Sequence, residues 1–485
     1  MTEPAYERLT GLDQSFLHFE TPNCYMHVAI TAVFEGGSLV HSRGLDIKRI
    51  RRHIASRLPL IPRYRQRLAF IPVVNDAVWI DDDHFELDYH VRHTNLPHPG
   101  SEKQLQTLCA RILERPLDRK RPLWEAWFIE GLPGNHFAML SKVHHCMVDG
   151  VAGVDLMAAL LGYTKTEEPE KPQRWVPRPA PTGRQLLRDD LKRRVEASAG
   201  LLRRVPDAVG HPAETGGDLG GRLSAFWSLL RKLPTAAADT PFNQTIGPHR
   251  RLDWVRFDLD EVKAVKNAIG GSLNDVVLAT VAGATRRYLH RRRVSVEGID
   301  FRAVVPVNMR PADDRGSTGN RVSIWFTPLP LAESNPLERY DLIRRTTAEC
   351  KESHTARGAE MLTETADWTT SHVLGLAVRL VNRTHPYNLI VTNVPGPPAT
   401  FYLLDAPMTA AYPHVPLFEN QGLGIALFSY AGALYWGLVG DWDLVPDIHH
   451  FVEFLRESFA ELREAAGVAK AAPASSSTPR RARVA

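Results

Sequence analysis

Two adjacent histidines, His144 and His145, are the side chains of this sequence best suited to acid–base chemistry. They follow the apolar run 137–140, and Asp149 and Gly150 come shortly after them. Apolar residues with helical spacing continue beyond the glycine, so the order predicts a strand, a polar turn and a helix. Because imidazole accepts and returns protons near neutral pH, this spacing predicts a positioned general base on a fixed turn.

Neighbouring side chains on a strand point to opposite faces, so His144 and His145 are not expected to share one metal ion or one proton. One should face a cavity and the other the interior of the fold. Asp149 either caps the following helix or pairs with an arginine, and Gly150 suits a backbone that bends or is closely approached. The alternative is a packed pair of histidines beside an N-capping aspartate, without a catalytic role.

Other chemistries have little support in the sequence. The four cysteines are scattered without a CxxC pair, which is typical of a reduced intracellular protein without a disulfide framework or zinc site. Cys146 follows His145, but strand neighbours diverge and do not form a nucleophile–base pair. His449 and His450 lack a following Asp-Gly and fall in a predicted helix, which favours a structural role. We therefore predict no metal ion and no cofactor.

The bulk composition is that of a soluble globular protein. The chain has 485 residues, which is more than one core usually spans, so two domains are expected. A net charge of +4 is small for this length and argues against nucleic acid as a partner. Changes in composition divide the chain into an N-terminal domain at 1–163, a proline-rich and basic linker at 164–240, a second domain at 241–466 and a disordered tail at 467–485.

Periodicity and capping residues predict strands and helices in both domains. Trp124 opens one strand and is most simply a core anchor. The predicted strands include 27–34, 124–129, 255–259, 301–307, 322–329 and 388–393, and the predicted helices include 47–57, 104–113, 259–269, 273–290, 339–351 and 448–464.

Two segments raise the question of membrane contact. Residues 185–205 have a basic and an apolar helical face, so they form either a solvated connector, which we prefer, or a surface that meets anionic lipid. Residues 421–440 carry no formal charge and are long enough to span a bilayer. Their five glycines disfavour a helix, and the pattern predicts a hairpin of strands 423–429 and 434–439 instead. The N-terminus lacks an apolar signal segment, which favours a cytoplasmic location.

The segment from His144 to Gly150 resembles the HHxxxDG signature of the coenzyme-A-dependent acyltransferase superfamily. Pro122-Leu123-Trp124 and Asn274-Asp275 resemble two further motifs of the bacterial wax ester synthase/diacylglycerol acyltransferase family. This similarity extends over residues 8–465 and includes Leu12-Asp13, 241–243, 246–250, 305–310 and 392–397.

The resemblance implies an α/β fold of two chloramphenicol-acetyltransferase-like domains, each a mixed sheet flanked by helices, which meet at a substrate tunnel. It implies that His145 is the general base in the middle of this tunnel and that His144 supports it. Asp149 would hold the turn through an arginine, for which Arg310 is the candidate, and Asn274 would help to orient the site. The remaining residues expected to shape the site are Gly150, Asp275, Pro122, Leu123 and Trp124.

The reaction implied by the resemblance is direct acyl transfer from long-chain acyl-CoA to diacylglycerol or a fatty alcohol. Coenzyme A thioester is then a substrate, no cofactor is needed, and the protein would work at a membrane or lipid-droplet surface from the cytoplasm. Two alternatives stay open: a carrier-protein-dependent condensation enzyme, and a lipid-binding protein on the same fold without catalysis.

Overall fold

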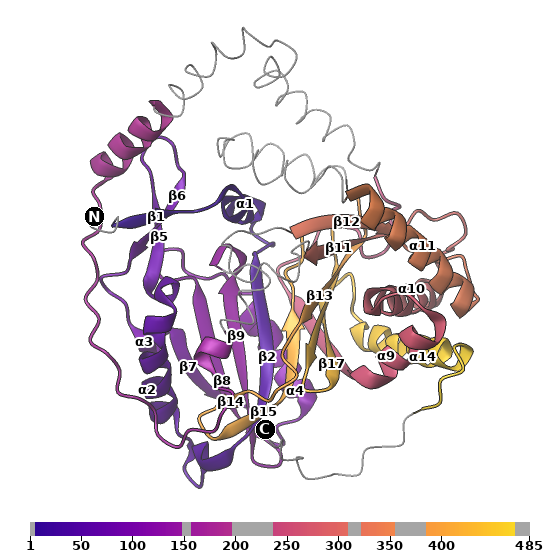
Figure 1. The fold of residues 1–485 in the computed structure, drawn as a ribbon, viewed down its shortest axis with the longest axis horizontal. Helices are drawn as coiled ribbons and strands as arrows, with labels where there is room; N and C mark the ends of the chain where they lie inside the picture. The colour runs from indigo at the N-terminus through magenta and orange to yellow at the C-terminus, as the bar shows by residue number, and fades with distance from the viewer. Residues whose placement is uncertain (1–4, 148–156, 196–235, 309–321, 355–384, 471–485) are drawn as a thin grey trace, which may run out of the picture.

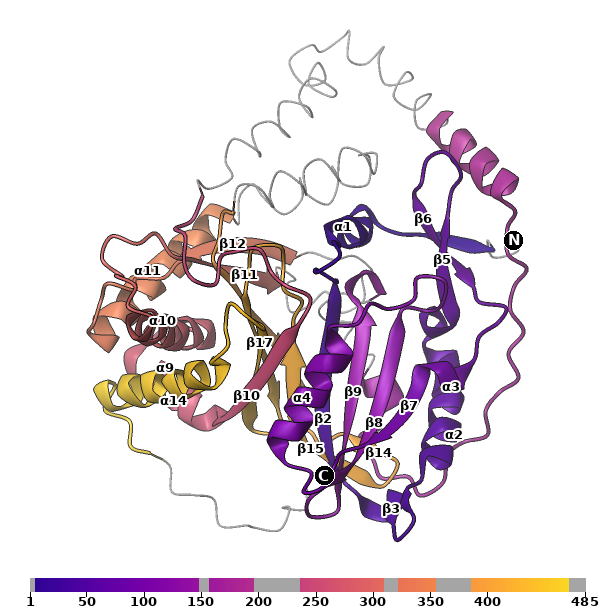
Figure 2. The same ribbon diagram turned by 180° about the vertical axis from the view of Figure 1, so that it is seen from behind.

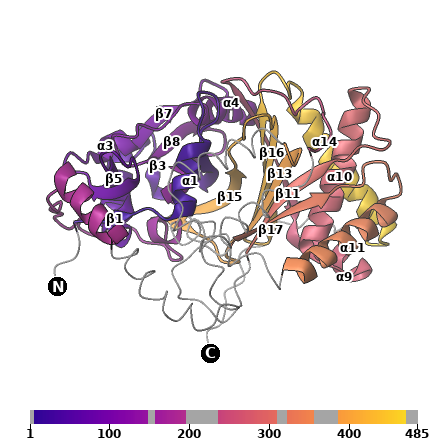
Figure 3. The same cartoon turned by 90° about the horizontal axis from the view of Figure 1, so that it is seen from above.

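The computed structural model describes residues 5–147, 157–195, 236–308, 322–354 and 385–470. Two six-stranded sheets lie side by side in it and form the centres of two lobes (Figures 1, 2 and 3). The first lobe contains the sheet with strand order β14-β15-β2-β9-β8-β7, and the second lobe the sheet with order β10-β17-β16-β13-β11-β12. Helices flank both sheets, so the predicted α/β fold is confirmed.

The sheet of the first lobe is mixed, because β7 and β8 run parallel and the other neighbours are antiparallel. β9 lies between β2 and β8, and it pairs with β2 up to its last residue, His144, and with β8 up to Val143. The strands are β2 (His27–Glu35), β7 (Val91–Asn95), β8 (Trp124–Leu132), β9 (His136–His144), β14 (Tyr402–Leu403) and β15 (Ala406–His414).

Helices and two small sheets complete the first lobe. The α4 helix begins after its N-cap residue Ser101, whose side chain forms a capping box with Gln104. The helices are α1 (Gly11–Phe19), α2 (Ile47–Arg57), α3 (Leu87–His90) and α4 (Glu102–Leu113). The small sheets contain β1 (Tyr6–Arg8), β5 (Gln66–Phe70) and β6 (Ala77–Asp81), and β3 (Val40–His41) and β4 (Gly44–Leu45).

The sheet of the second lobe is also mixed, with parallel pairs at β11–β13 and β13–β16. Its helices lie on the side of the sheet away from the first lobe (Figure 3). The strands are β10 (Arg250–Asp258), β11 (Arg302–Asn308), β12 (Val322–Pro328), β13 (Leu389–Pro395), β16 (Leu423–Tyr430) and β17 (Ala433–Asp441). The helices are α9 (Leu259–Ile269), α10 (Leu273–Arg291), α11 (Pro336–His354) and α14 (Ile448–Ala465).

The β15 strand connects the two lobes. This strand follows β13 in the sequence, yet it pairs antiparallel with β2, with His414 opposite Ala29. It also passes so close to β17 that a Cβ atom on Gly437 would lie 1.7 Å from the carbonyl oxygen of Pro413. The first sheet therefore contains strands from within 241–466, and the predicted domain boundaries stay predictions.

Several local predictions agree with the structure. Helices 47–57 and 259–269 have the predicted bounds, and the uncharged segment 421–440 is the β16–β17 hairpin. No helix among the described residues is long and apolar enough to cross a membrane. The basic segment is helical at 183–195, and its remaining part lies outside the described residues.

Candidate active site

The β9 strand delivers the two histidines to the end of the first sheet. His144 is its last residue, and a 3-10 turn, η4 (His145–Met147), follows directly. The backbone N–H of His144 donates to the carbonyl oxygen of Leu123 at 3.0 Å, so the Pro122-Leu123-Trp124 segment lies beside the histidines. Trp124 itself is buried, and its indole N–H donates to the Tyr64 carbonyl, as expected of a core anchor.

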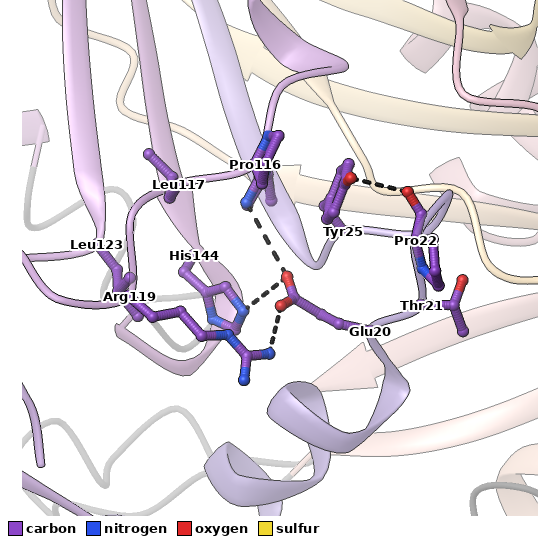
Figure 4. Close-up of a pocket in the computed structure, with 10 residues that line it drawn as sticks. Glu20, Thr21, Pro22, Tyr25, Pro116, Leu117, Arg119, Leu123 and His144 are labelled. Carbon is purple, nitrogen blue, oxygen red and sulfur yellow. Dashed lines mark hydrogen bonds and ion pairs between the residues drawn. The ribbon is translucent and has the colours of Figure 1, made fainter.

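His144 is buried, and both nitrogens of its ring are engaged. Its Nδ1 accepts the backbone N–H of Cys146 at 3.1 Å, and its Nε2 lies 3.1 Å from Oε1 of Glu20 (Figure 4). An amide N–H can only donate, so Nδ1 carries the lone pair and the proton of the neutral ring is on Nε2. The Nε2–H group then donates to the Glu20 carboxylate, which can only accept.

His145 has different surroundings from His144, because the strand ends at His144 and His145 is the first residue of the 3-10 turn. Its backbone N–H donates to the carbonyl oxygen of Met26 at 2.7 Å. Its partly buried ring stacks on Phe16 of α1, with 3.9 Å between ring centroids and 22° between the planes. The pocket described below has His144 in its wall and not His145, so a tunnel with His145 at its middle stays a prediction.

A pocket of about 330 Å³ opens in front of His144 (Figure 4). Its walls combine apolar and polar side chains, and the Glu20–Arg119 ion pair lies within it. The lining residues are Glu20, Thr21, Pro22, Tyr25, His27, Pro116, Leu117, Arg119, Leu123 and His144. The predicted residues Leu123 and His144 thus face the same cavity.

Glu20 is the electrostatic centre of this pocket. Burial alone raises the pKa of its carboxyl group, but the hydrogen bonds and electrostatic attraction from His144 and Arg119 outweigh burial and lower the pKa to about 2. Neither Glu20 nor Arg119 was singled out from the sequence. Glu20 is the C-cap residue of α1, where the helix dipole disfavours an anion. That local mismatch is the one signal that could have marked Glu20 as a carboxylate with partners elsewhere in the fold.

Lys142 fixes the wall that carries Pro116 and Leu117. This buried side chain on β9 donates from Nζ to the carbonyl oxygens of Ile112 at 2.9 Å and Arg115 at 2.6 Å, at the end of α4. Burial lowers the pKa of the Lys142 ammonium group to about 8. A lysine at these carbonyls also complements the helix dipole, so it stabilises the turn that leads into the pocket.

The opposite wall, residues 20–26, is held by the second lobe. The Asn23 side chain donates to the Ile246 carbonyl at 3.0 Å, and the Cys24 thiol donates to the Leu417 carbonyl at 3.1 Å. The buried Arg250 guanidinium donates to the Asn23 carbonyl. The motif at 246–250 therefore connects the second lobe to the wall of the histidine pocket.

The Asn274-Asp275 motif lies at the start of α10. Asp275 forms a capping box with Ser272 and also accepts a hydrogen bond from the Thr347 hydroxyl at 2.7 Å. Asn274 accepts a hydrogen bond from the side chain of Asn393 on β13 at 2.9 Å. Two motifs that are distant in the sequence thus meet at one helix end, while a direct role of Asn274 in orienting the site stays a prediction.

Three predicted site residues, Asp149, Gly150 and Arg310, lie outside the described residues. Cys146 is buried, and burial raises the pKa of its thiol well above the ordinary value. Among the described residues, no group of three His, Cys, Asp or Glu side chains is arranged to hold a metal ion.

Sequence comparison connects this site to a known family. Residues 9–277 match the wax ester synthase/diacylglycerol acyltransferase catalytic domain, and residues 318–463 match the C-terminal domain of the same family. A Mycobacterium tuberculosis protein that is named as a diacylglycerol O-acyltransferase is 34% identical over 470 residues, which cover 95% of this chain and 91% of that protein.

Comparison with solved structures indicates the same family. The wax ester synthase/diacylglycerol acyltransferase from Marinobacter aquaeolei VT8 superposes with a TM-score of 0.70 at 25% identity, over 95% of this chain and 100% of that one. The starter condensation domain of rhizomide synthetase has a TM-score of 0.57 at 12% identity, over 96% and 95% of the two chains, which shows a shared fold alone. The chain therefore belongs to the wax ester synthase/diacylglycerol acyltransferase family.

Proposed function

We propose that this acyl-CoA-dependent O-acyltransferase esterifies diacylglycerol to triacylglycerol with His145 as the general base. The observation that carries the assignment within the histidine pair is the engagement of His144. Its Nδ1 accepts the Cys146 amide and its Nε2 faces Glu20, so it has no nitrogen available to take a proton from substrate. His145 is the neighbouring imidazole and is the first residue of the turn η4.

The proposed step is a direct transfer. His145 takes the proton of the acceptor hydroxyl while the oxygen attacks the carbonyl carbon of the thioester. The new C–O bond forms, the C–S bond breaks, and the electron pair leaves with the sulfur of coenzyme A. The thiolate then takes the proton from the imidazolium ring, which releases the ester and free coenzyme A and restores the neutral base.

The state of Cys146 supports direct transfer over a covalent acyl-enzyme. A thiol acts as a nucleophile in its thiolate form, and burial raises the pKa of the Cys146 thiol well above its ordinary value. The side chain is 3% exposed. A protonated, buried thiol beside the histidines is a packing residue, so the acyl group would pass to the acceptor without a cysteine intermediate.

Diacylglycerol is proposed as the acceptor from the name of the Mycobacterium tuberculosis relative, and long-chain alcohols from the name of the Marinobacter enzyme. The test offers labelled palmitoyl-CoA to the purified protein with diacylglycerol, hexadecanol or a small amine. Triacylglycerol or wax ester supports the proposal. Amide as the main product favours a condensation-type enzyme, and no product with any acceptor favours lipid binding without catalysis.

Changing His145 to Ala should lower kcat by about 10²- to 10⁴-fold, because general-base catalysis contributes on that scale. The measurement is the rate of coenzyme A release with palmitoyl-CoA and diacylglycerol. His450→Ala is the matched control, since this histidine belongs to another adjacent pair, on α14, and contacts Arg291 of α10 and Glu453 of α14. A His145→Ala protein with wild-type kcat would remove the proposed base.

We also propose that residues 183–195 are the part of the enzyme that contacts a lipid surface. One face of this helix is anchored to the first lobe. Leu186 is buried in a cluster with Ile71, Val78 and Ile80, and the carboxylate of Asp190, which is 1% exposed, pairs with Arg8 at 2.9 Å.

The other face carries apolar side chains that are open to solvent. Leu187, Leu191 and Val195 recur every four residues and are 37%, 62% and 59% exposed. A basic row, Arg184, Arg188 and Lys192, runs beside them at the same spacing. An exposed apolar stripe next to basic side chains suits the boundary between anionic headgroups and acyl chains, where the lipid substrates would also be found.

A further inference from the structure

The geometry points to Glu20 as a positioning residue for the histidine turn: its carboxylate holds the backbone on both sides of the His145 Cα atom. This inference rests on the proposed role of His145 as the base. It assigns a task to a side chain that does not touch the His145 ring, acts through His144 and Met26, and lies in the pocket wall (Figure 4).

The first connection passes through the His144 ring. Oε1 of Glu20 lies 3.1 Å from Nε2 of His144, and a carboxylate at this place keeps the ring proton on Nε2. Nδ1 of the same ring is then left as an acceptor for the backbone N–H of Cys146 at 3.1 Å. The peptide group that follows His145 is therefore held by the tautomer that Glu20 selects.

The second connection passes through the backbone of Met26. The same Oε1 atom of Glu20 accepts the N–H of Met26 at 3.0 Å. The carbonyl oxygen of Met26 accepts the N–H of His145 at 2.7 Å. The peptide group that precedes His145 is therefore held as well, and both connections begin at one carboxylate oxygen.

The α1 helix adds a third constraint on the base. This helix ends at Phe19, immediately before Glu20, and its Phe16 stacks on the His145 ring at 3.9 Å. Arg119 pairs with Oε2 of Glu20 and donates to the Leu17 carbonyl at 3.3 Å. The arginine thereby neutralises both the carboxylate and the negative end of the helix, which explains how an anion is tolerated at this C-cap.

Two substitutions separate the hydrogen bonds of Glu20 from its charge. In Glu20→Gln, an amide oxygen can still accept from Met26 and His144, while the ion pair with Arg119 is lost. In Glu20→Ala, both connections are lost. Glu453→Gln is the matched control, because this glutamate accepts a hydrogen bond from a histidine, His450, on the exposed surface of α14.

The direct readout is the tautomer of His144 in the full-length protein, measured by ¹⁵N NMR of histidine-labelled samples. Its signals are assigned by their loss in a His144→Gln sample. The wild type and Glu20→Gln should have the proton on Nε2, whereas Glu20→Ala should lose this preference. A proton on Nδ1 in the wild type, or an unchanged tautomer in Glu20→Ala, overturns the inference.

The kinetic readout separates positioning from substrate binding. Glu20→Ala should lower kcat by about 10²-fold with a small change in the KM for palmitoyl-CoA, because a displaced base loses about that factor. Glu20→Gln should recover most of this loss, and Glu453→Gln should equal the wild type. A raised KM with an unchanged kcat would make Glu20 a binding residue.

The NMR result stands apart from the proposed function. If His145→Ala kept its activity while Glu20→Ala lost the His144 tautomer, the base assignment would fail and the anchoring by Glu20 would hold. If Glu20→Ala does not fold, the comparison of Glu20→Gln with the wild type still decides the case. A Glu20→Gln protein that folds but loses both the tautomer and activity contradicts the hydrogen-bond account.

Discussion

At the scale of single residues, two adjacent imidazoles have different tasks because their nitrogens meet different partners. Both ring nitrogens of His144 hold the turn, because Nδ1 accepts a hydrogen bond from a backbone amide and Nε2–H donates one to Glu20. His145 is stacked on Phe16 and bonded through its backbone to Met26. The division follows from where β9 ends, since its last residue, His144, lines the pocket and the next residue begins a 3-10 turn.

The lowered pKa of Glu20 predicts a pH dependence of stability. Its pKa is about 2 in the folded protein and 4.5 without partners, so the unfolded chain binds more protons between these values. Its stabilising contribution is therefore fully present above pH 4.5 and is lost as the pH falls toward 2. On this basis the stability advantage of the wild type over Glu20→Gln should shrink by about 3 kcal/mol across that window.

Urea unfolding of the two proteins at pH 6, 5, 4 and 3 measures the upper part of this window, over which the advantage should shrink by about 2 kcal/mol. Glu453→Gln is the control, because that carboxylate pairs with His450 in the solvent. A difference that stays constant over the series, or that grows toward acid, would contradict the assigned partners of Glu20.

The residues of the site were predictable from the sequence only where they form contiguous motifs. His144 and His145 stand out by their spacing from Asp149, and Leu123 by its neighbours. Glu20 is separated in the sequence from His144 by 124 residues and from Arg119 by 99, and no local pattern encodes such pairs. Chemistry that depends on residues distant in the sequence becomes visible only when the fold brings them together.

At the scale of elements, short helices at the periphery set the position of functional groups. Bounds that depend on local signals were predictable: α2 and α9 begin after Asp46 and Asp258, whose side chains cap the first turn. The anchoring of helix 183–195 by Asp190 was not predictable, because its partner Arg8 comes from the other end of the first lobe's sequence.

Replacing Leu191 with Asp should weaken binding of the protein to anionic vesicles by at least about tenfold, because the apolar stripe of helix 183–195 would carry a charge. The measurement is co-sedimentation with phosphatidylcholine vesicles that contain or lack phosphatidylglycerol. Leu342→Asp is the matched control, since Leu342 is an exposed leucine on α11. Equal binding by both variants would exclude this face as the lipid contact.

At the scale of the whole molecule, the β15 strand joins the two lobes. It completes the first sheet by pairing with β2, and its Pro413 carbonyl lies against Gly437 of β17. The α/β class was implied by the family resemblance, and the strands and helices predicted along the chain agree with it. The placement of β15 in the first sheet was not predictable, since a strand pattern predicts an extended segment but not the sheet to which it belongs.

Replacing Gly437 with Ala should destabilise the protein by about 3 kcal/mol, because a Cβ atom would overlap a backbone carbonyl that cannot move without disturbing β15. Thermal unfolding measures the effect. Gly247→Ala is the matched control, as its Cβ atom would meet Asp441 at 3.7 Å, an ordinary contact. Similar melting temperatures for the two variants would mean that the strands are less closely joined than described.

The late arrival of β15 has a consequence for biosynthesis. The hydroxyl of Thr409 on this strand bonds to Val33 of β2, 376 residues earlier in the chain. At about 5–20 residues per second on the ribosome, about 20 to 75 s pass between the synthesis of β2 and that of its partner strand β15. During that interval an unpaired hydrogen-bonding edge is exposed, which invites pairing between nascent chains and makes chaperone protection most valuable before residue 406 emerges.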